Sequence, residues 1–157
     1  MKVKMLNVNY FIEGNRTVIP TKMVYEEQNE DEYLSIHYEV ELNDQSYVSR
    51  ASVCTEFAVI ALQKALPGNM SIACCQSCRH GNFCPFGDQE DEIFCFKDTQ
   101  FHNKYDVVEK FSNRDESLTA RKRKLLAYCS DYKPISHQQF YTYNDWGINS
   151  ANAGEFD

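Results

Sequence analysis

Residues 33 to 42 read Tyr-Leu-Ser-Ile-His-Tyr-Glu-Val-Glu-Leu, the most regular stretch of the chain. Apolar side chains alternate there with polar ones, and the apolar set is Leu34, Ile36, Tyr38, Val40 and Leu42. A period of two predicts a β-strand with one buried and one solvated face. Such strands are typical of an antiparallel sheet that is covered on one side only. We expect His37, which falls on the polar face, to be exposed to solvent.

The stretches on the N-terminal side of this strand also look extended. Residues 2–12 and 16–25 are joined by the turn signal Gly14-Asn15. Apolar residues occupy both parities of 2–12, which indicates either a β-bulge or packing on both faces. Residues 26–32, Glu-Glu-Gln-Asn-Glu-Asp-Glu, predict an acidic connection between the second and third strands.

A helix is predicted over 52–66, directly after the N-terminal strands. Ser52 is a suitable N-cap, and Pro67-Gly68 supplies a stop signal. The apolar positions, from Val53 onward, form a broad stripe that predicts a well-buried helix packed on the N-terminal sheet. Cys54 lies in the first turn and is expected to be a small core residue.

The second half of the chain has weaker signals. Short strands are predicted at 71–75 and 92–97, with an ordered loop between them, so that a cysteine-rich hairpin forms. A short helix is possible around 107–111, and a longer C-terminal helix is expected from about 115 to 129, where Asp115 and Glu116 favour a helix N-terminus.

These elements predict an α+β fold: an antiparallel N-terminal sheet packed on the buried helix, the cysteine-rich hairpin and a C-terminal helical segment. We expect a single domain over 1–148, with a cysteine-rich knuckle at 73–97 and a flexible tail at 149–157.

Composition narrows the class of protein. The chain has 157 residues, 43% hydrophobic and 25% charged, which is typical of one globular domain and unlike a disordered or membrane-spanning protein. A net charge of −7 argues against general nucleic-acid binding, because phosphate contacts need a cationic surface. The N-terminus lacks the pattern of a secretory signal, and the longest apolar run is too short to cross a membrane. We therefore expect a cytoplasmic protein with reduced thiols.

Five of the seven cysteines lie between residues 74 and 95. Cys75 and Cys78 have the C-x2-C spacing of a zinc knuckle, and Cys84 and Cys95 supply a second, more widely spaced pair. The sequence thus predicts a structural Zn²⁺ site formed by Cys75, Cys78, Cys84 and Cys95. His80 can replace Cys84 in this set, and Cys74 can replace Cys75. Packing of reduced thiols and redox or disulfide chemistry are the alternatives.

This segment resembles a family of small bacterial proteins that has no established activity. The resemblance covers residues 73–97 and rests on the C-x2-C pair, a Pro-aromatic-Gly turn and a late Cys-Phe. The matching positions are Cys75, Cys78, Pro85, Gly87 and Cys95. His80 and Cys84 stand where the family has aromatic residues. The resemblance implies a coherent domain and no particular activity.

No catalytic motif is present, so we do not expect an enzyme. Residues 26–44 contain eight acids and no Lys or Arg. Such a surface favours a basic protein partner, as in an immunity protein or antitoxin-like inhibitor. The alternative is a metal-dependent or redox-active module that uses the cluster Cys74–Cys95. The basic run 121–124 is expected on a solvated helix face, and contact with nucleic acid is the weaker interpretation.

Overall fold

The computed structural model describes residues 1–30, 32–87, 91–113 and 116–147. The fold is α+β, as predicted. The chain divides into two compact units, Met1–Ala73 and Cys74–Ile148, and each is described by itself. The prediction of a single domain over 1–148 stays a prediction, because one domain can contain two such units. The predicted tail at 149–157 lies outside the described residues.

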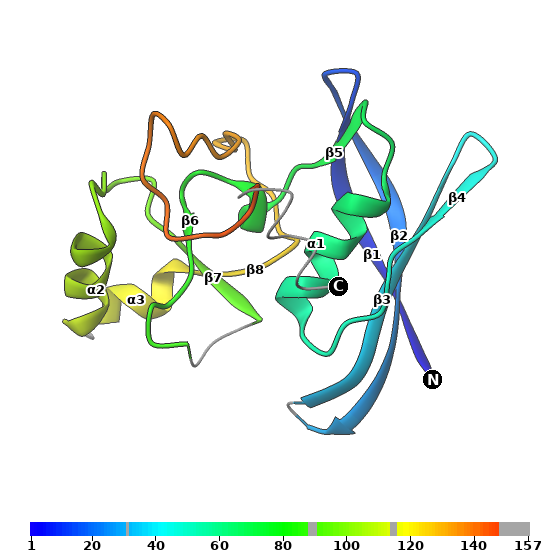
Figure 1. The fold of residues 1–157 in the computed structure, drawn as a ribbon, viewed down its shortest axis with the longest axis horizontal. Coiled ribbons are helices and arrows are strands. Elements are labelled where there is room, and N and C mark those ends of the chain that lie inside the picture. The colour runs from blue at the N-terminus through cyan, green and yellow to red at the C-terminus, as the bar shows by residue number, and fades with distance from the viewer. Residues whose placement is uncertain (31, 88–90, 114–115, 148–157) are drawn as a thin grey trace. The chain divides into compact units, whose positions relative to one another are not determined.

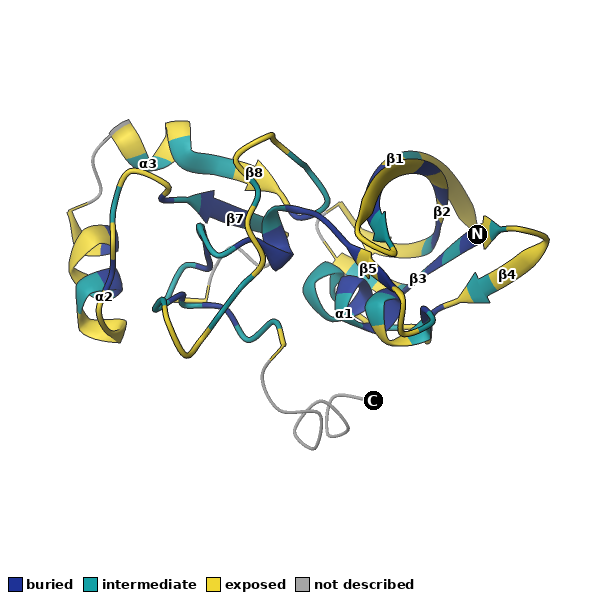
Figure 2. Cartoon of the chain, turned by 90° about the horizontal axis from the view of Figure 1, so that it is seen from above, coloured by how far each residue is buried: buried dark blue, intermediate teal, exposed yellow. Residues whose placement is uncertain are grey.

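The first unit is built on a five-stranded antiparallel sheet with the strand order β4-β3-β2-β1-β5. The sheet is curled (Figures 1 and 2). Its strands are β1 (Lys2–Ile12), β2 (Asn15–Asn29), β3 (Glu32–Leu42), β4 (Gln45–Val48) and β5 (Met70–Ile72).

Tight turns set the register of the first unit. Glu13 and Gly14, with φ of 52° and 84°, join β1 to β2. Asn43 and Asp44, with φ of 52° and 65°, join β3 to β4. Two consecutive residues with positive φ form the turn whose twist matches that of the flanking strands. The predicted turn at Gly14 is confirmed, whereas β4 has no counterpart among the predicted strands.

The bulge considered for residues 2–12 is absent. β1 and β2 pair without interruption from Lys2↔Tyr25 to Ile12↔Asn15. Apolar residues occupy both parities because Val3 and Met5, each 58% exposed, lie on the solvated face. The irregular pairing lies instead between β2 and β3, on either side of Glu27.

The prediction of an acidic connection over 26–32 is therefore wrong, because most of these residues belong to strands. β2 continues to Asn29, and β3 begins at Glu32. Backbone pairing with a neighbouring strand outweighs the low strand propensity of glutamate there.

The alternation in β3 is confirmed from Ile36 to Val40, whereas Leu34, which was predicted on the buried face, is 50% exposed. Ile36, Tyr38 and Val40 are at most 2% exposed and form the core of the first unit with the buried side of α1 (Thr55–Ala65). The helix contacts β3 and β4, and part of it is coloured as buried in Figure 2. His37 is only partly exposed, because its Nε2 lies 2.7 Å from a carboxylate oxygen of Glu39.

The predicted helix begins too early. Ser52 is not its N-cap: its backbone exchanges two hydrogen bonds with Ile36, 2.8 and 2.9 Å long, and this extends the sheet by one bridge. Cys54 occupies the N-cap position without a capping side-chain bond, and Val53 is 70% exposed. The stop at Pro67-Gly68 is confirmed, since α1 ends at Ala65.

The second unit has a small sheet with the order β6-β7-β8 and a phenylalanine cluster. Its elements are the 3₁₀ helix η1 (Cys75–Ser77), β6 (Gly81–Asn82), β7 (Glu92–Cys95), α2 (Lys104–Ser112), α3 (Glu116–Arg121) and β8 (Lys122–Lys124). The rings of Phe94, Phe96, Phe101 and Phe111 meet edge to face at centroid distances of 4.9 to 5.6 Å.

Two predicted elements of the second half are wrong. The strand predicted at 71–75 does not form a hairpin with 92–97: β5 pairs with β1, and β7 pairs with β6 and β8. The helix predicted over 115–129 ends at Arg121. Lys122 to Lys124 pair with β7, opposite Phe94 to Glu92, so the basic run lies mainly on an edge strand. Pairing with a distant strand here outweighs local helix propensity.

None of the helices in the described ranges is long and apolar enough to cross a membrane.

We predict that Leu62→Ala lowers the free energy of unfolding by about 2–5 kcal/mol, because Leu62 is fully buried and its truncation leaves a cavity. The matched control is Val53→Ala, which removes an exposed side chain from the same segment and is expected to cost about 0.5 kcal/mol or less. Denaturant unfolding measures both values. Equal losses for the two variants would contradict the packing described for α1.

Candidate metal centre

The C-x2-C pair lies on a tight turn. Cys75 begins η1, and the amide of Cys78 donates to the carbonyl of Cys75 at 3.3 Å. The amide of Gly81 then donates to the carbonyl of Cys78 at 2.9 Å and starts β6. Two cysteines three positions apart are thus held on a single turn of backbone, as a metal-binding pair requires.

Cys95 reaches the same place from a different part of the chain. It is the register partner of Gly81 where β6 pairs with β7. The amide of Phe96 donates to the carbonyl of His80 at 2.9 Å, and the guanidinium of Arg121 donates to the carbonyl of Cys95 at 3.0 Å. β7 is therefore anchored at Cys95 to the C-x2-C turn through Gly81 and His80, and to α3 through Arg121.

A cavity of about 100 Å³ lies where these segments meet, and we call it the thiol cavity. Four cysteines line it: Cys75, Cys78, Cys95 and Cys129. Its other lining residues with polar or charged side chains are His80, Lys97, Arg123, Tyr128 and Asp131. None of the seven cysteines, all within the described ranges, forms a disulfide.

The other two cysteines of the predicted cluster lie elsewhere. Cys84 packs against the phenylalanine cluster and does not line the thiol cavity. Cys74 is fully buried before η1, where its amide donates to the Ser77 hydroxyl at 3.1 Å and its sulfur lies 3.7 Å from that oxygen. The structure thus brings together Cys75, Cys78 and Cys95 of the predicted set, with His80 beside them.

Cys129 is the residue that the sequence interpretation missed. It is the last residue of the helix predicted over 115–129, whereas in the structure it follows β8 in an irregular segment, residues 125–147 (orange in Figure 1). The amides of Cys75 and Gln76 donate to the carbonyls of Ala127 and Leu125 at 2.7 and 3.1 Å. No spacing rule identifies this cysteine, because hydrogen bonds between distant segments place it.

Further hydrogen bonds hold the segment 125–147 to the C-x2-C turn. The side-chain amide of Asn144 donates to the carbonyls of Gln76 and Gly81, at 2.7 and 3.1 Å. The hydroxyl of Thr142 donates to the carbonyl of Arg79 at 2.7 Å. The segment has no periodic structure and is nevertheless fixed in place by the turn.

Burial raises the pKa values of the thiols on the turn. The pKa of Cys75 rises to about 12, first through burial and then through the neighbouring sulfurs, those of Cys95 and Cys129 among them. Burial also raises the pKa of Cys78, and this effect is opposed by hydrogen bonds from the backbone amides of Lys133 and His80. Without a cation these thiols hold their protons at neutral pH, and amides directed at a sulfur favour its thiolate once a cation is present.

The charged residues that line the thiol cavity are Lys97, Arg123 and Asp131. The ammonium of Lys97 lies 2.8 Å from a carboxylate oxygen of Asp131, and the guanidinium of Arg123 donates to the carbonyls of Ala120 and Lys122. Two cations beside clustered cysteines reduce the cost of gathering thiolates.

His80 is held beside the cysteines as a neutral ring. Burial lowers its pKa, with a further contribution from Arg79. The ring meets Phe140 edge to face with 5.9 Å between centroids, and its buried Nδ1 has no hydrogen-bond partner among the described residues. A neutral imidazole nitrogen without a partner is a possible ligand.

The donors fit zinc by chemistry but are not arranged around a common point. Within the described residues, no group of three or more His, Cys, Asp or Glu side chains stands ready to hold a metal ion. Zinc–sulfur bonds are about 2.3 Å long. Binding would therefore require the cysteine side chains that line the cavity to rotate inward.

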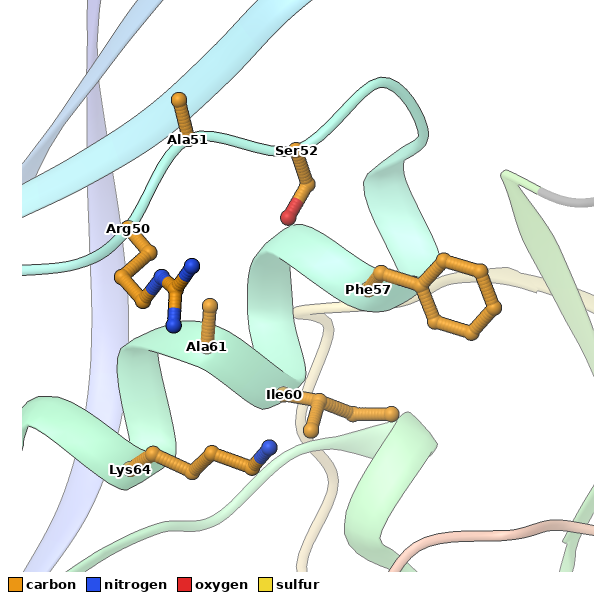
Figure 3. Close-up of a pocket in the computed structure, with 7 residues that line it drawn as sticks. All are labelled: Arg50, Ala51, Ser52, Phe57, Ile60, Ala61 and Lys64. Atoms are coloured by element: carbon orange, nitrogen blue, oxygen red, sulfur yellow. The ribbon is translucent and has the colours of Figure 1, made fainter. Parts of the chain in front are cut away.

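A second cavity, of about 20 Å³, lies within the first unit between α1 and residues 50–52 (Figure 3). Its lining includes Arg50 and Lys64 together with Phe57, Ile60 and Ala61. A space of this size holds about one water molecule, so we assign it no ligand.

Comparisons of the chain with protein families, curated proteins and solved structures find no match. The function therefore has to be inferred from the geometry and chemistry of the thiol cavity.

We predict that Gly81→Ala destabilises the second unit by about 1–3 kcal/mol, because an added Cβ would overlap the carbonyl oxygen of Cys75 and come within 2.9 Å of Ile93 Cδ1. Gly68→Ala is the control, since nothing lies within 4 Å of its added Cβ. Thermal unfolding of both variants tests the prediction. A control as unstable as Gly81→Ala would show that close approach to the C-x2-C turn is not the cause.

Proposed function

We propose that the second unit is a zinc-binding module in which the thiol cavity holds one structural ion, and that the chain is a binding protein and not an enzyme. The observation that carries the proposal is the convergence of three predicted cysteines on one cavity. Cys75 and Cys78 come from the η1 turn, and Cys95 comes from β7. Cysteines from segments distant in sequence are the usual ligands of small structural zinc sites.

Ligand chemistry favours zinc over hard cations. Thiolates prefer zinc, copper(I) and iron–sulfur clusters, whereas Mg²⁺ and Ca²⁺ take oxygen ligands. When bound, zinc supplies a positive charge that stabilises the thiolates and joins the η1 turn to β7.

Redox catalysis is less well supported. A catalytic cysteine needs a lowered pKa, because the thiolate is the nucleophile. The pKa of Cys75 is instead raised to about 12, and that of Cys78 is also raised. The C-x2-C pair begins a three-residue 3₁₀ turn, not the α-helix that lowers a thiol pKa in disulfide oxidoreductases.

The first unit supports a second proposal, a basic protein partner. Glu26, Glu27, Glu30 and Glu32 are exposed at the paired ends of β2 and β3, and Glu41 is exposed further along β3. Acidic side chains on adjacent strands attract cationic surfaces and accelerate their association. An immunity or antitoxin-like role follows only by analogy with such pairs, and cytoplasmic location belongs to the same proposal.

We predict that protein purified without added metal contains about one zinc ion per chain, and that Cys78→Ser and Cys95→Ser lose this zinc and become strongly destabilised. Elemental analysis and thermal unfolding measure both effects. The control Cys54→Ala removes a cysteine that does not line the thiol cavity. We expect this variant to retain zinc and to lose only local packing. Metal-free wild-type protein, or equal small changes for all three variants, would contradict the proposal.

We predict for the acidic strands that Glu30→Gln with Glu32→Gln weakens the capture of a basic protein from cell extract, and that moderate salt weakens capture by the wild type in the same way. Quantitative mass spectrometry of captured proteins is the measurement. Glu109→Gln, on exposed α2, is the control. If the Glu30→Gln, Glu32→Gln variant and the Glu109→Gln control both recover as much of the same basic protein as the wild type does, these acids do not take part in binding.

A further inference from the structure

Three ligands leave a zinc ion one protein donor short of a closed tetrahedral structural site. Besides Cys75, Cys78 and Cys95, three residues that line the thiol cavity carry groups able to bind zinc: His80, Cys129 and Asp131. Cys84, the fourth ligand expected from the sequence, packs against the phenylalanine cluster instead. The candidates for the fourth ligand are therefore His80, Cys129 and Asp131.

Hydrogen bonds on both sides of Cys129 hold it opposite the C-x2-C turn. On its N-terminal side, the amide of Cys75 donates to the carbonyl of Ala127 at 2.7 Å. On its C-terminal side, the amide of Arg79 donates to the carbonyl of Lys133 at 2.8 Å. Cys75, the first cysteine of the C-x2-C pair, and Arg79, the residue after the second, thus hold the two ends of a short loop, and Cys129 lies in that loop.

The loop is also closed internally and tied to η1. The amide of Tyr132 donates to the carbonyl of Cys129 at 3.1 Å. The hydroxyl of Tyr132 lies 3.0 Å from the hydroxyl of Ser77. These contacts hold the backbone of Cys129 at the thiol cavity, where its side chain is one of the lining groups.

The two competing residues are less suitable. Asp131 is engaged by the ammonium of Lys97 at 2.8 Å, and a carboxylate is a poorer partner than a thiolate in a sulfur-rich site. The ring of His80 packs edge to face on Phe140, but its buried Nδ1 has no hydrogen-bond partner among the described residues, so His80 is the closer competitor of Cys129.

We infer that Cys129 is the fourth ligand, so that the zinc set is Cys75, Cys78, Cys95 and Cys129. This inference rests on the proposed zinc function. Cys129, the exposed member of the set, closes the outer side of the site. A set of four protein ligands leaves no position for an activated water, and the ion ties the irregular segment 125–147 to η1 and β7.

The test compares Cys129→Ser with the matched control Cys84→Ser. We expect Cys129→Ser to bind zinc at least tenfold more weakly than the wild type in a chelator competition, and Cys84→Ser to bind it as the wild type does. Cys129→His, which replaces the sulfur with an imidazole nitrogen donor at the same position, is expected to recover part of the affinity. Folding of each variant is checked by circular dichroism, so that lost binding is not confused with an unfolded chain.

Cobalt(II) substitution identifies the ligands directly. The wild type, Cys84→Ser and His80→Gln are expected to give the absorption spectrum of a four-thiolate tetrahedral site, and Cys129→Ser a spectrum with weaker sulfur-to-cobalt charge transfer. Hydrogen exchange of residues 125–133 is expected to slow when zinc binds the wild type. Zinc binding that survives Cys129→Ser but is lost in His80→Gln would overturn the inference and leave the zinc function intact. Failure of the wild type to bind any zinc or cobalt would overturn both.

Discussion

The hydrogen bond from the amide of Cys75 to the carbonyl of Ala127 is the constraint on which the candidate centre depends. Together with the bond from Arg79 to Lys133, it attaches an irregular segment to the turn that carries the C-x2-C pair. Satisfying these backbone groups replaces the regular pairing that the segment lacks. This attachment brings Cys129 to the thiol cavity, while the pairing of β6 with β7 brings Cys95 to it.

Ionised thiols that lie close together repel one another unless a cation compensates their charge. Burial and neighbouring sulfurs raise the pKa of Cys75, so ionising it without a cation is costly. The same low-polarity surroundings strengthen the attraction between a thiolate and a bound cation. Lys97 and Arg123 at the rim act in the same direction as the ion. The arrangement is thus better suited to holding a soft metal than to presenting a reactive thiolate.

The two units use different means to order the chain. In the first, the paired tight turns and the alternation of Ile36, Tyr38 and Val40 create a sheet whose buried face is covered by α1. In the second, strands of two to four residues are too short to form a stable sheet alone, and the phenylalanine cluster and side-chain bonds such as those of Asn144 supply the remaining contacts. A bound metal ion would therefore contribute more stability to the second unit, which has the shorter strands.

Local patterns in the sequence were sufficient for the α+β class, the strand at 33–42, the turn at Gly14, the buried helix with its stop at Pro67-Gly68, and the close spacing of Cys75 and Cys78 on one turn. Each depends on interactions between residues near in sequence or on a period that burial imposes directly. Tertiary contacts alone decided that Ser52 joins the sheet, that Lys122 to Lys124 form a strand and that Cys129 faces the thiol cavity while Cys84 does not. In these cases the partner lies far along the chain, and the backbone hydrogen bonds and packing that it offers outweigh the local preference of the residue.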